Sequence, residues 1–206
     1  MFNKLSDLTL LSKGLPKARL AVAMGNDNDV IAAVEGARKL GAIYPILIGP
    51  QDEIYNLIKD QYDVNDYLII DANTPEDAAF KAVQMVNDNK ADLLMKGILD
   101  TKVLLKAVVN KETGIKEHQL LSHVAVLEFA KLDRLIFATD CAMVISPSLE
   151  EKVQILNNTL ELTKVLGLKI PKVGITSAVE KVNPKILSTV EASELVNLYK
   201  GRSDVI

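Results

Sequence analysis

Cysteine, histidine and tryptophan are nearly missing from this sequence of 206 residues, which holds one cysteine, two histidines and no tryptophan. A single cysteine, Cys141, cannot form a disulfide within the chain. One cysteine with two histidines is also a poor ligand set for zinc. We therefore expect a cytoplasmic protein without a structural metal.

A strong net charge and a long hydrophobic run are absent as well. Lys and Arg number 24 against 27 Asp and Glu, a formal charge of −3 with no basic block of five or more, which argues against nucleic acid as a partner. No apolar run approaches the roughly 18 residues that a membrane-spanning helix needs. Residues 1–12 lack the basic start and apolar core of a signal peptide. We expect no membrane partner.

The sequence also has no internal repeat, low-complexity tract or Gly/Ser-rich linker, so composition gives little help in placing a domain boundary. Its 49% apolar residues suffice for a full core. We predict a first domain over 1–146 and a second over 147–206, divided near Ser146-Pro147, where a long capped helix is expected to begin. Residues 203–206 resemble the start of a strand, so the second domain is expected to be incomplete.

What the sequence does contain is an alternation of short apolar runs and helical patterns. Continuous apolar runs are typical of strands covered on both faces. The alternation predicts an α/β fold with a doubly wound, mainly parallel sheet between two helix layers. Two runs joined by a short turn, 123–129 and 134–139, predict a local antiparallel pair. The predicted strands are 18–24, 43–49, 67–72, 92–95, 123–129, 134–139 and 172–176, and the helices are 29–40, 51–60, 75–88, 101–109, 149–165 and 185–200.

Two of these helices have well-marked starts. Thr74 before Pro75 is typical of an N-cap followed by the first helical residue, and Ser148 with Glu151 has the spacing of a capping box. The apolar spacing of the helix after Ser148 predicts a buried face made of Val153, Leu156 and Leu160, widened by Ile155 and Leu162.

A lysine and a glycine stand where the fourth predicted strand meets a helix. Ligands of open α/β sheets bind beyond the carboxyl ends of the strands, which is where Lys96 and Gly97 are expected. A helix starting near Thr101 would direct backbone N–H groups there, Gly97 would let an anion approach the backbone, and Lys96 would add a positive charge. This predicts a phosphate or carboxylate site, although neither a P-loop nor a dinucleotide fingerprint is present. The alternative is a solvated Lys96, a turn at Gly97 and an N-cap at Thr101.

The antiparallel pair places further polar residues at a strand start and a strand end. Ser122 and His123 begin one strand, and the Ser122 hydroxyl could bind an oxyanion, although a lone histidine such as His123 is more often a structural residue. Asp140 follows the other strand and could accept a proton or serve as a cap. Cys141 is expected to be a small buried residue and not a nucleophile.

The last predicted strand is followed by two hydroxyl side chains, Thr176 and Ser177, with Asn183 nearby. They could supply donors to a ligand. Asn183-Pro184 is also an ordinary helix start, so a capping role is the alternative. The candidates together describe a crevice with several anion donors and no evident covalent catalyst.

Four segments at this order and spacing resemble the phosphate acetyl/butyryltransferases, most closely the butyryltransferase branch: LLMKGILDTKVLLKAVVNKETGI, LLSHVAVLEF, LIFATDCAMVISPSLEEKVQILNNT and SAVEKVNPK. The resemblance implies transfer of a short acyl group, butyryl favoured, between coenzyme A and inorganic phosphate in a ternary complex. It also implies a two-domain architecture similar to isocitrate and isopropylmalate dehydrogenases, assembly as a homodimer or larger homo-oligomer, and no cofactor beyond the substrates.

The resemblance also assigns roles to the candidates. The phosphate is expected at Lys96, Gly97 and Thr101. The expected catalytic set is Lys96, Ser122, His123 and Asp140, and the expected acyl-CoA contacts are Thr176, Ser177 and Asn183.

One departure from the family leaves other functions open. Family members continue for roughly another third of their length, and that part supplies a Ser-Arg pair and an aspartate that are important to catalysis. The alternative function is therefore a noncatalytic or incomplete CoA- and phosphate-binding fragment. Another enzyme of the same broad fold, such as a dehydrogenase, is a third possibility.

Overall fold

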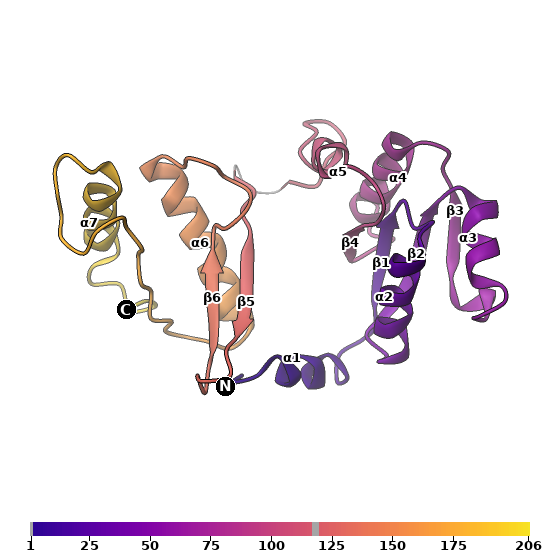
Figure 1. Cartoon of the computed structure of the whole chain (residues 1–206), viewed down its shortest axis with the longest axis horizontal. Coiled ribbons are helices and arrows are strands. Elements are labelled where there is room, and N and C mark those ends of the chain that lie inside the picture. The colour runs from indigo at the N-terminus through magenta and orange to yellow at the C-terminus, as the bar shows by residue number, and fades with distance from the viewer. Residues whose placement is uncertain (1, 117–119) are drawn as a thin grey trace. The chain divides into compact units, whose positions relative to one another are not determined.

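The computed structural model describes residues 2–116 and 120–206, and the chain divides into two compact units. We call residues 9–117 the contiguous unit, and residues 1–8 with 118–206 the composite unit (Figure 1). This division differs from the predicted boundary at Ser146-Pro147, which falls inside the composite unit. The reason is that the last strand before this point packs against the helix after it.

A parallel four-stranded sheet forms the centre of the contiguous unit. Its strands lie in the order β3-β2-β1-β4, and every neighbouring pair is parallel, as predicted. The strand bounds are β1 (Ala18–Ala23), β2 (Ile43–Gly49), β3 (Leu68–Asp71) and β4 (Leu93–Lys96).

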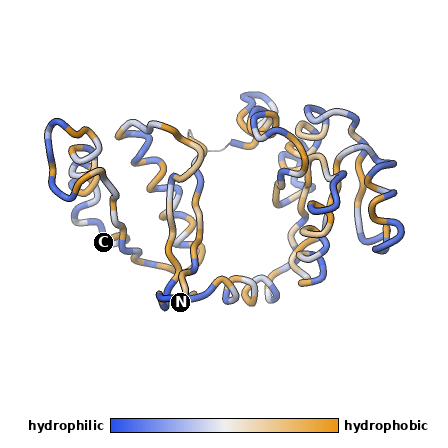
Figure 2. The backbone as a smooth tube through the Cα atoms, in the orientation of Figure 1, coloured by the Kyte–Doolittle hydropathy of each residue, from blue (hydrophilic) through white to orange (hydrophobic). Residues whose placement is uncertain are grey.

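Helices cover both faces of this sheet, which confirms the α/β class. Along β1 the side chains alternate: Ala21 and Ala23 pack with α4 and α5, whereas Leu20 and Val22 pack with α2 and α3. The hydropathy along the chain shows these strands as largely hydrophobic (Figure 2). The helices are α2 (Asn28–Lys39), α3 (Gln51–Ile58), α4 (Pro75–Asn87) and α5 (Thr101–Val108), and a 3-10 turn η1 (Val64–Asp66) precedes β3.

A charged residue, Glu35 on the inner face of α2, is buried in this unit with only 3% of its surface exposed. Its carboxylate accepts two hydrogen bonds from the Arg38 guanidinium, at 2.7 and 3.0 Å, and one from the Tyr67 hydroxyl at 2.5 Å. The bonds from Arg38 lower the pKa of Glu35 from 4.5 to about 2, against the opposing effect of burial. Burial, followed by the bond to Glu35, raises the pKa of Tyr67. The cluster ties α2 to the start of β3.

The composite unit contains the predicted antiparallel pair, β5 (Val124–Glu128) with β6 (Leu135–Thr139), and the helices α6 (Leu149–Val165) and α7 (Leu187–Tyr199). A helix near the N-terminus, α1 (Leu5–Ser12), was not predicted. The strand predicted at 172–176 is absent. This segment makes two backbone hydrogen bonds to Ile206 in a parallel arrangement. The Val173 N–H donates to the Ile206 carbonyl, and the Ile206 N–H donates to the Pro171 carbonyl. Two bonds are too few to form a strand ladder.

The predicted helix caps are present, but the buried face of α6 differs from the prediction. Thr74 accepts the Asp77 N–H, and Ser148 and Glu151 form a reciprocal capping box. The buried residues of α6 are Ile155, Thr159 and Thr163. The two threonine hydroxyls donate to carbonyls of the same helix, so these side chains are buried with their hydroxyls satisfied, which an apolar pattern does not detect.

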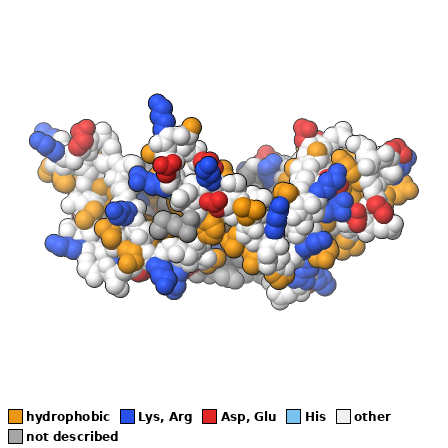
Figure 3. All heavy atoms as spheres, turned by 90° about the horizontal axis from the view of Figure 1, so that it is seen from below, with side chains coloured by type: hydrophobic (Ala, Val, Ile, Leu, Met, Phe, Trp, Pro, Cys, Tyr) orange, Lys and Arg blue, Asp and Glu red, His pale blue; other side chains and the backbone are white. Residues whose placement is uncertain are grey.

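The charged side chains are dispersed on the surface seen in Figure 3, where Lys and Arg lie among acidic and apolar groups. In the described part of the chain, no helix has both the length and the apolarity that crossing a membrane requires.

Candidate functional site

The sheet order reverses between β1 and β4, because the chain builds β1, β2 and β3 in one direction and then places β4 on the other side of β1. Ligands of open α/β sheets bind at such a reversal, beyond the carboxyl ends of the two strands. Lys96 is the last residue of β4 and lies in register with Ala23, the last residue of β1. The structure thus places the Lys-Gly loop at the switch point of the contiguous unit.

The Lys96 ammonium is held over its own loop. It donates to the carbonyls of Gly97, at 3.2 Å, and Leu99, at 3.0 Å. An ammonium has three N–H donors, so one is left for another acceptor. Because the side chain is exposed, that donor is accessible to an anion in solution.

Gly97 has a different role from the one its position predicted. Its N–H donates to the Ala23 carbonyl at 2.8 Å and is therefore used within the protein. A Cβ atom at Gly97 would lie 2.0 Å from the Met24 carbonyl oxygen, which also accepts the Ile98 N–H at 2.9 Å. Glycine is needed here because the loop after β4 lies directly on the backbone at the end of β1, and its N–H is not free to bind an anion.

The start of α5 also differs in detail from the prediction. The helix begins at Thr101, as expected, but the N-cap is Asp100, whose carboxylate accepts the Lys102 N–H at 2.8 Å. The Thr101 side chain is exposed. A carboxylate at the cap partly neutralises the positive end of the helix dipole, so Lys96 provides more of the attraction for an anion than the helix does.

In the composite unit, Ser122, His123 and Asp140 come together at one end of the β5-β6 pair. Val124 is paired with Thr139, which brings the residues before β5 next to those after β6. The Thr139 hydroxyl donates to the His123 carbonyl at 2.8 Å, and this bond closes the end of the hairpin.

The Asp140 carboxylate organises the loop after β6. Its Oδ1 accepts the N–H groups of Ala142 at 2.9 Å and Met143 at 3.0 Å. Burial alone would raise the pKa of Asp140, but several backbone N–H groups together outweigh burial and lower it; they belong to Ala142, Met143, His123 and Val144. A carboxylate with a lowered pKa is a weak base, so this geometry suits an anchor of the loop better than a proton acceptor.

Asn158, a residue of α6, contacts Ser122. The Asn158 amide nitrogen donates to Ser122 Oγ at 2.9 Å and to the Leu120 carbonyl at 3.2 Å. Sequence reasoning missed this residue, because an asparagine inside a helix carries no local signal of a partner 36 residues earlier in the chain.

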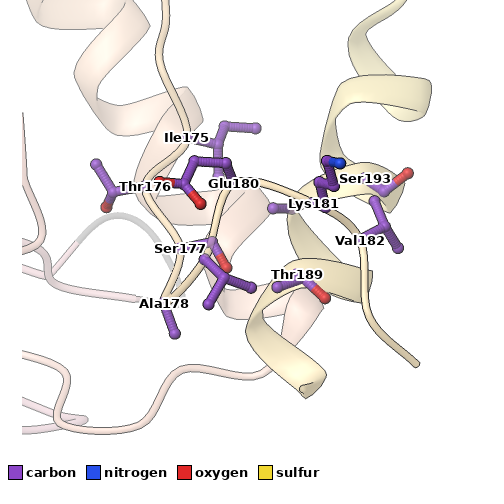
Figure 4. A pocket seen from close by; sticks show the side chains of 11 residues that line it. Ile175, Thr176, Ser177, Ala178, Glu180, Lys181, Val182, Thr189 and Ser193 are labelled. Atoms are coloured by element: carbon purple, nitrogen blue, oxygen red, sulfur yellow. The ribbon is translucent and has the colours of Figure 1, made fainter. Parts of the chain in front are cut away.

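A pocket of about 380 Å³ lies between the segment after 174 and α7 (Figure 4). Thr176 and Ser177 line it, and the Ser177 and Ser188 hydroxyls are 3.1 Å apart. Asn183 does not line it; its side-chain oxygen accepts the Lys185 N–H at 3.0 Å, in a turn that precedes α7. The lining residues are Ile175, Thr176, Ser177, Ala178, Val179, Glu180, Lys181, Val182, Thr189, Ala192 and Ser193.

The predicted residues thus fall into two groups, one in each unit. Lys96, Gly97 and Thr101 belong to the contiguous unit, and the others belong to the composite unit.

A second missed residue is Asn26, in the loop after β1, whose amide donates to Glu53 at 2.8 Å. Ligands of open α/β sheets bind beyond the carboxyl ends of the two strands at the reversal, so the loop after β1 is a candidate as well as the loop after β4. The loop after β1 can be recognised only when the strand order is known.

No group of three His, Cys, Asp or Glu side chains over residues 2–116 and 120–206 is arranged to hold a metal ion. The expectation that the reaction needs no cofactor stays a prediction.

Comparison with known proteins decides the family. The family model described as "Phosphate acetyl/butaryl transferase" matches residues 70–205. This chain belongs to that family. Among curated members of the phosphate acetyl/butyryl transferase family, a phosphate butyryltransferase of Clostridium acetobutylicum is 40% identical over 196 residues, which cover 95% of this chain and 65% of that protein. A probable phosphate butyryltransferase of Bacillus subtilis is 42% identical over 198 residues, covering 96% and 66%.

Acetyltransferases and solved structures of the same family also match. A phosphate acetyltransferase of Thermotoga maritima is 36% identical over 192 residues, covering 93% of this chain and 65% of that protein. The crystal structure of a branched-chain phosphotransacylase from Enterococcus faecalis V583 superposes with a TM-score of 0.80 at 28% identity, covering 91% of this chain and 66% of that one. The chain therefore spans about 65% of the length of these family members.

Proposed function

We propose that this chain carries substrate-binding parts of an acyltransferase that moves a short acyl group, butyryl favoured, between coenzyme A and inorganic phosphate. Membership of the phosphate acetyl/butyryl transferase family supports the reaction class. The observation that carries the proposal is Lys96 at the switch point, with two N–H groups fixed on its loop and one left for an anion.

The chemistry asks the protein mainly to bind and orient. A phosphate oxygen forms a bond to the thioester carbonyl carbon, the C–S bond breaks, and coenzyme A leaves as a thiolate that takes up a proton. Positioning of the two substrates and stabilisation of the developing oxyanion account for most of such a rate enhancement, so no enzyme nucleophile is required. We assign phosphate binding to Lys96, oxyanion or phosphate contact to Ser122 and His123, and acyl-CoA contact to Thr176 and Ser177.

The test is thiol release from butyryl-CoA by the 206-residue chain, with and without inorganic phosphate, and in parallel from acetyl-CoA. Phosphate-dependent release supports the transferase, and the ratio of the two substrates measures the preference for butyryl. Because the chain spans about 65% of its relatives' length, a noncatalytic CoA- and phosphate-binding protein is the second candidate. Binding of phosphate and CoA by calorimetry without thiol release would support that candidate.

Replacement of Lys96 by alanine is expected to raise the phosphate KM or lower turnover at least tenfold, about 1.4 kcal/mol, because the positive charge at the switch point is lost. The measurement is the phosphate dependence of thiol release. Lys102→Ala, which removes an exposed lysine from the first turn of α5, is the matched control and should change these constants less than twofold. Equal kinetics for the wild type and Lys96→Ala would remove Lys96 from the site.

A further inference from the structure

The amide of Asn158 determines which way the Ser122 hydroxyl points. The orientation of the Asn158 amide follows from its second partner, the Leu120 carbonyl. This carbonyl is 3.2 Å from the amide nitrogen and can only accept a hydrogen bond. The amide group that faces this carbonyl must therefore be the NH₂ group. The same nitrogen lies 2.9 Å from Ser122 Oγ, so it is a donor to that oxygen as well.

A hydroxyl that accepts one hydrogen bond still has its own proton to donate. The bond from Asn158 occupies a lone pair of Ser122 Oγ and directs the O–H away from α6. Within the part of the chain that the structure describes, no group accepts this proton. Ser122 is only partly buried, so a substrate oxygen can reach its hydroxyl.

We propose that Asn158 is a positioning residue that holds Ser122 as a hydrogen-bond donor to a substrate oxygen, either of phosphate or of the thioester carbonyl. Asn158 touches no substrate itself and acts through Ser122. The inference rests on the proposed function, because Ser122 must contact a substrate for its orientation to matter. A fixed donor needs no reorganisation during the reaction, which is how such groups stabilise developing charge.

Asn158→Asp (N158D) keeps the size of the side chain and reverses its hydrogen bonding. An aspartate cannot donate to the Leu120 carbonyl, and it would accept the Ser122 proton and turn the hydroxyl toward α6. We expect kcat/KM for phosphate-dependent thiol release from butyryl-CoA to fall at least tenfold. Asn157→Asp (N157D) makes the same charge change one residue earlier, but keeps the oxygen that accepts the Tyr199 hydroxyl at 2.7 Å. N157D should stay within twofold of the wild type.

A double-mutant cycle with Ser122→Ala separates positioning from folding. If Asn158 acts through Ser122, N158D should lower kcat/KM little further in the Ser122→Ala background. A full additional loss there would show a structural role and overturn the inference. If N158D does not fold, as judged by circular dichroism, N158A replaces it in the same cycle, because it removes the donor without adding a charge.

The two proposals fail in different ways. A wild-type chain without phosphate-dependent thiol release and without phosphate binding by calorimetry overturns the proposed function, and the inference falls with it. If that chain binds phosphate without release, N158D and N157D are compared by their Kd for phosphate and their Kd for butyryl-CoA instead, and a tenfold difference is expected in at least one of the two. Equal values for N158D and N157D, in an active or binding wild-type chain, overturn the inference alone.

Discussion

Replacement of Gly97 by alanine is expected to destabilise the contiguous unit by on the order of 3 kcal/mol or more. The added Cβ would lie 2.0 Å from the Met24 carbonyl oxygen and 2.6 Å from that of Ala23. Both are backbone atoms at the end of β1, so relief requires the loop or the strand to move. Movement would break the bonds from Gly97 and Ile98 to these carbonyls.

Tyrosine fluorescence during urea denaturation measures this effect. The chain has no tryptophan, and four of its five tyrosines lie in the contiguous unit, so the signal reports mainly on that unit; they are Tyr44, Tyr55, Tyr62 and Tyr67. Gly36→Ala is the matched control. A Cβ there meets no atom within 4 Å on the exposed side of α2, so this change should stabilise the unit by roughly 0.5–1 kcal/mol. A Gly97→Ala protein as stable as the wild type would contradict the close approach.

Replacement of Glu35 by glutamine is expected to cost about 3 kcal/mol at neutral pH. A fall in the pKa of Glu35 from 4.5 to about 2 corresponds to a free energy of this size. The substitution also removes the buried carboxylate that pairs with Arg38, but the partly exposed Arg38 keeps an ion pair with Asp66 at 2.8 Å, so the expected cost stays at about 3 kcal/mol.

The pH dependence gives this prediction its sign. The folded pKa of Glu35 lies below the unfolded value, so its stabilisation is complete above about pH 4.5 and is lost as the pH falls toward 2. The difference in free energy of unfolding between wild type and Glu35→Gln should therefore be constant from pH 5 to 8 and shrink between pH 4.5 and 2. Glu194→Gln, the same substitution at an exposed position of α7, is the matched control. A difference that does not vary with pH would contradict the assignment to the carboxylate charge.

Local patterns in the sequence were sufficient to predict most of the elements. All six predicted helices and six of the seven predicted strands are present, because apolar periodicity and caps are local signals. The prediction of a strand at 172–176 was wrong, because an apolar run forms a strand only where a neighbouring strand can hydrogen-bond to it along its length. The buried face of α6 was predicted only in part. Ile155 is buried as expected, whereas Thr159 and Thr163 were missed because a threonine counts as polar in a pattern even when its hydroxyl bonds to a helix carbonyl.

The candidate site was predictable in position and not in detail. Placing Lys96 at the end of β4 needed only the strand-helix order. The reason for Gly97 needed the neighbouring strand, because Met24 is 73 positions away in the chain and meets it only through the β1-β4 pairing. The role of Asn158 could be recognised only from the contact of α6 with Ser122, which is 36 positions earlier in the chain. Contacts between distant parts of one chain are what a single sequence does not reveal.

The division of the chain into a contiguous and a composite unit sets an order in time for folding. All strands and helices around the parallel sheet are available once residue 117 has been synthesised, whereas the composite unit must join residues 1–8 to a segment after 118. The Leu5 N–H and the Glu128 carboxylate, 2.8 Å apart, are separated by 123 positions in sequence. Closing such a long loop is slow compared with local pairing. In pulse-labelled hydrogen exchange during refolding, we expect the amides of β1 and β2 to be protected before that of Leu5, and the reverse order would contradict this.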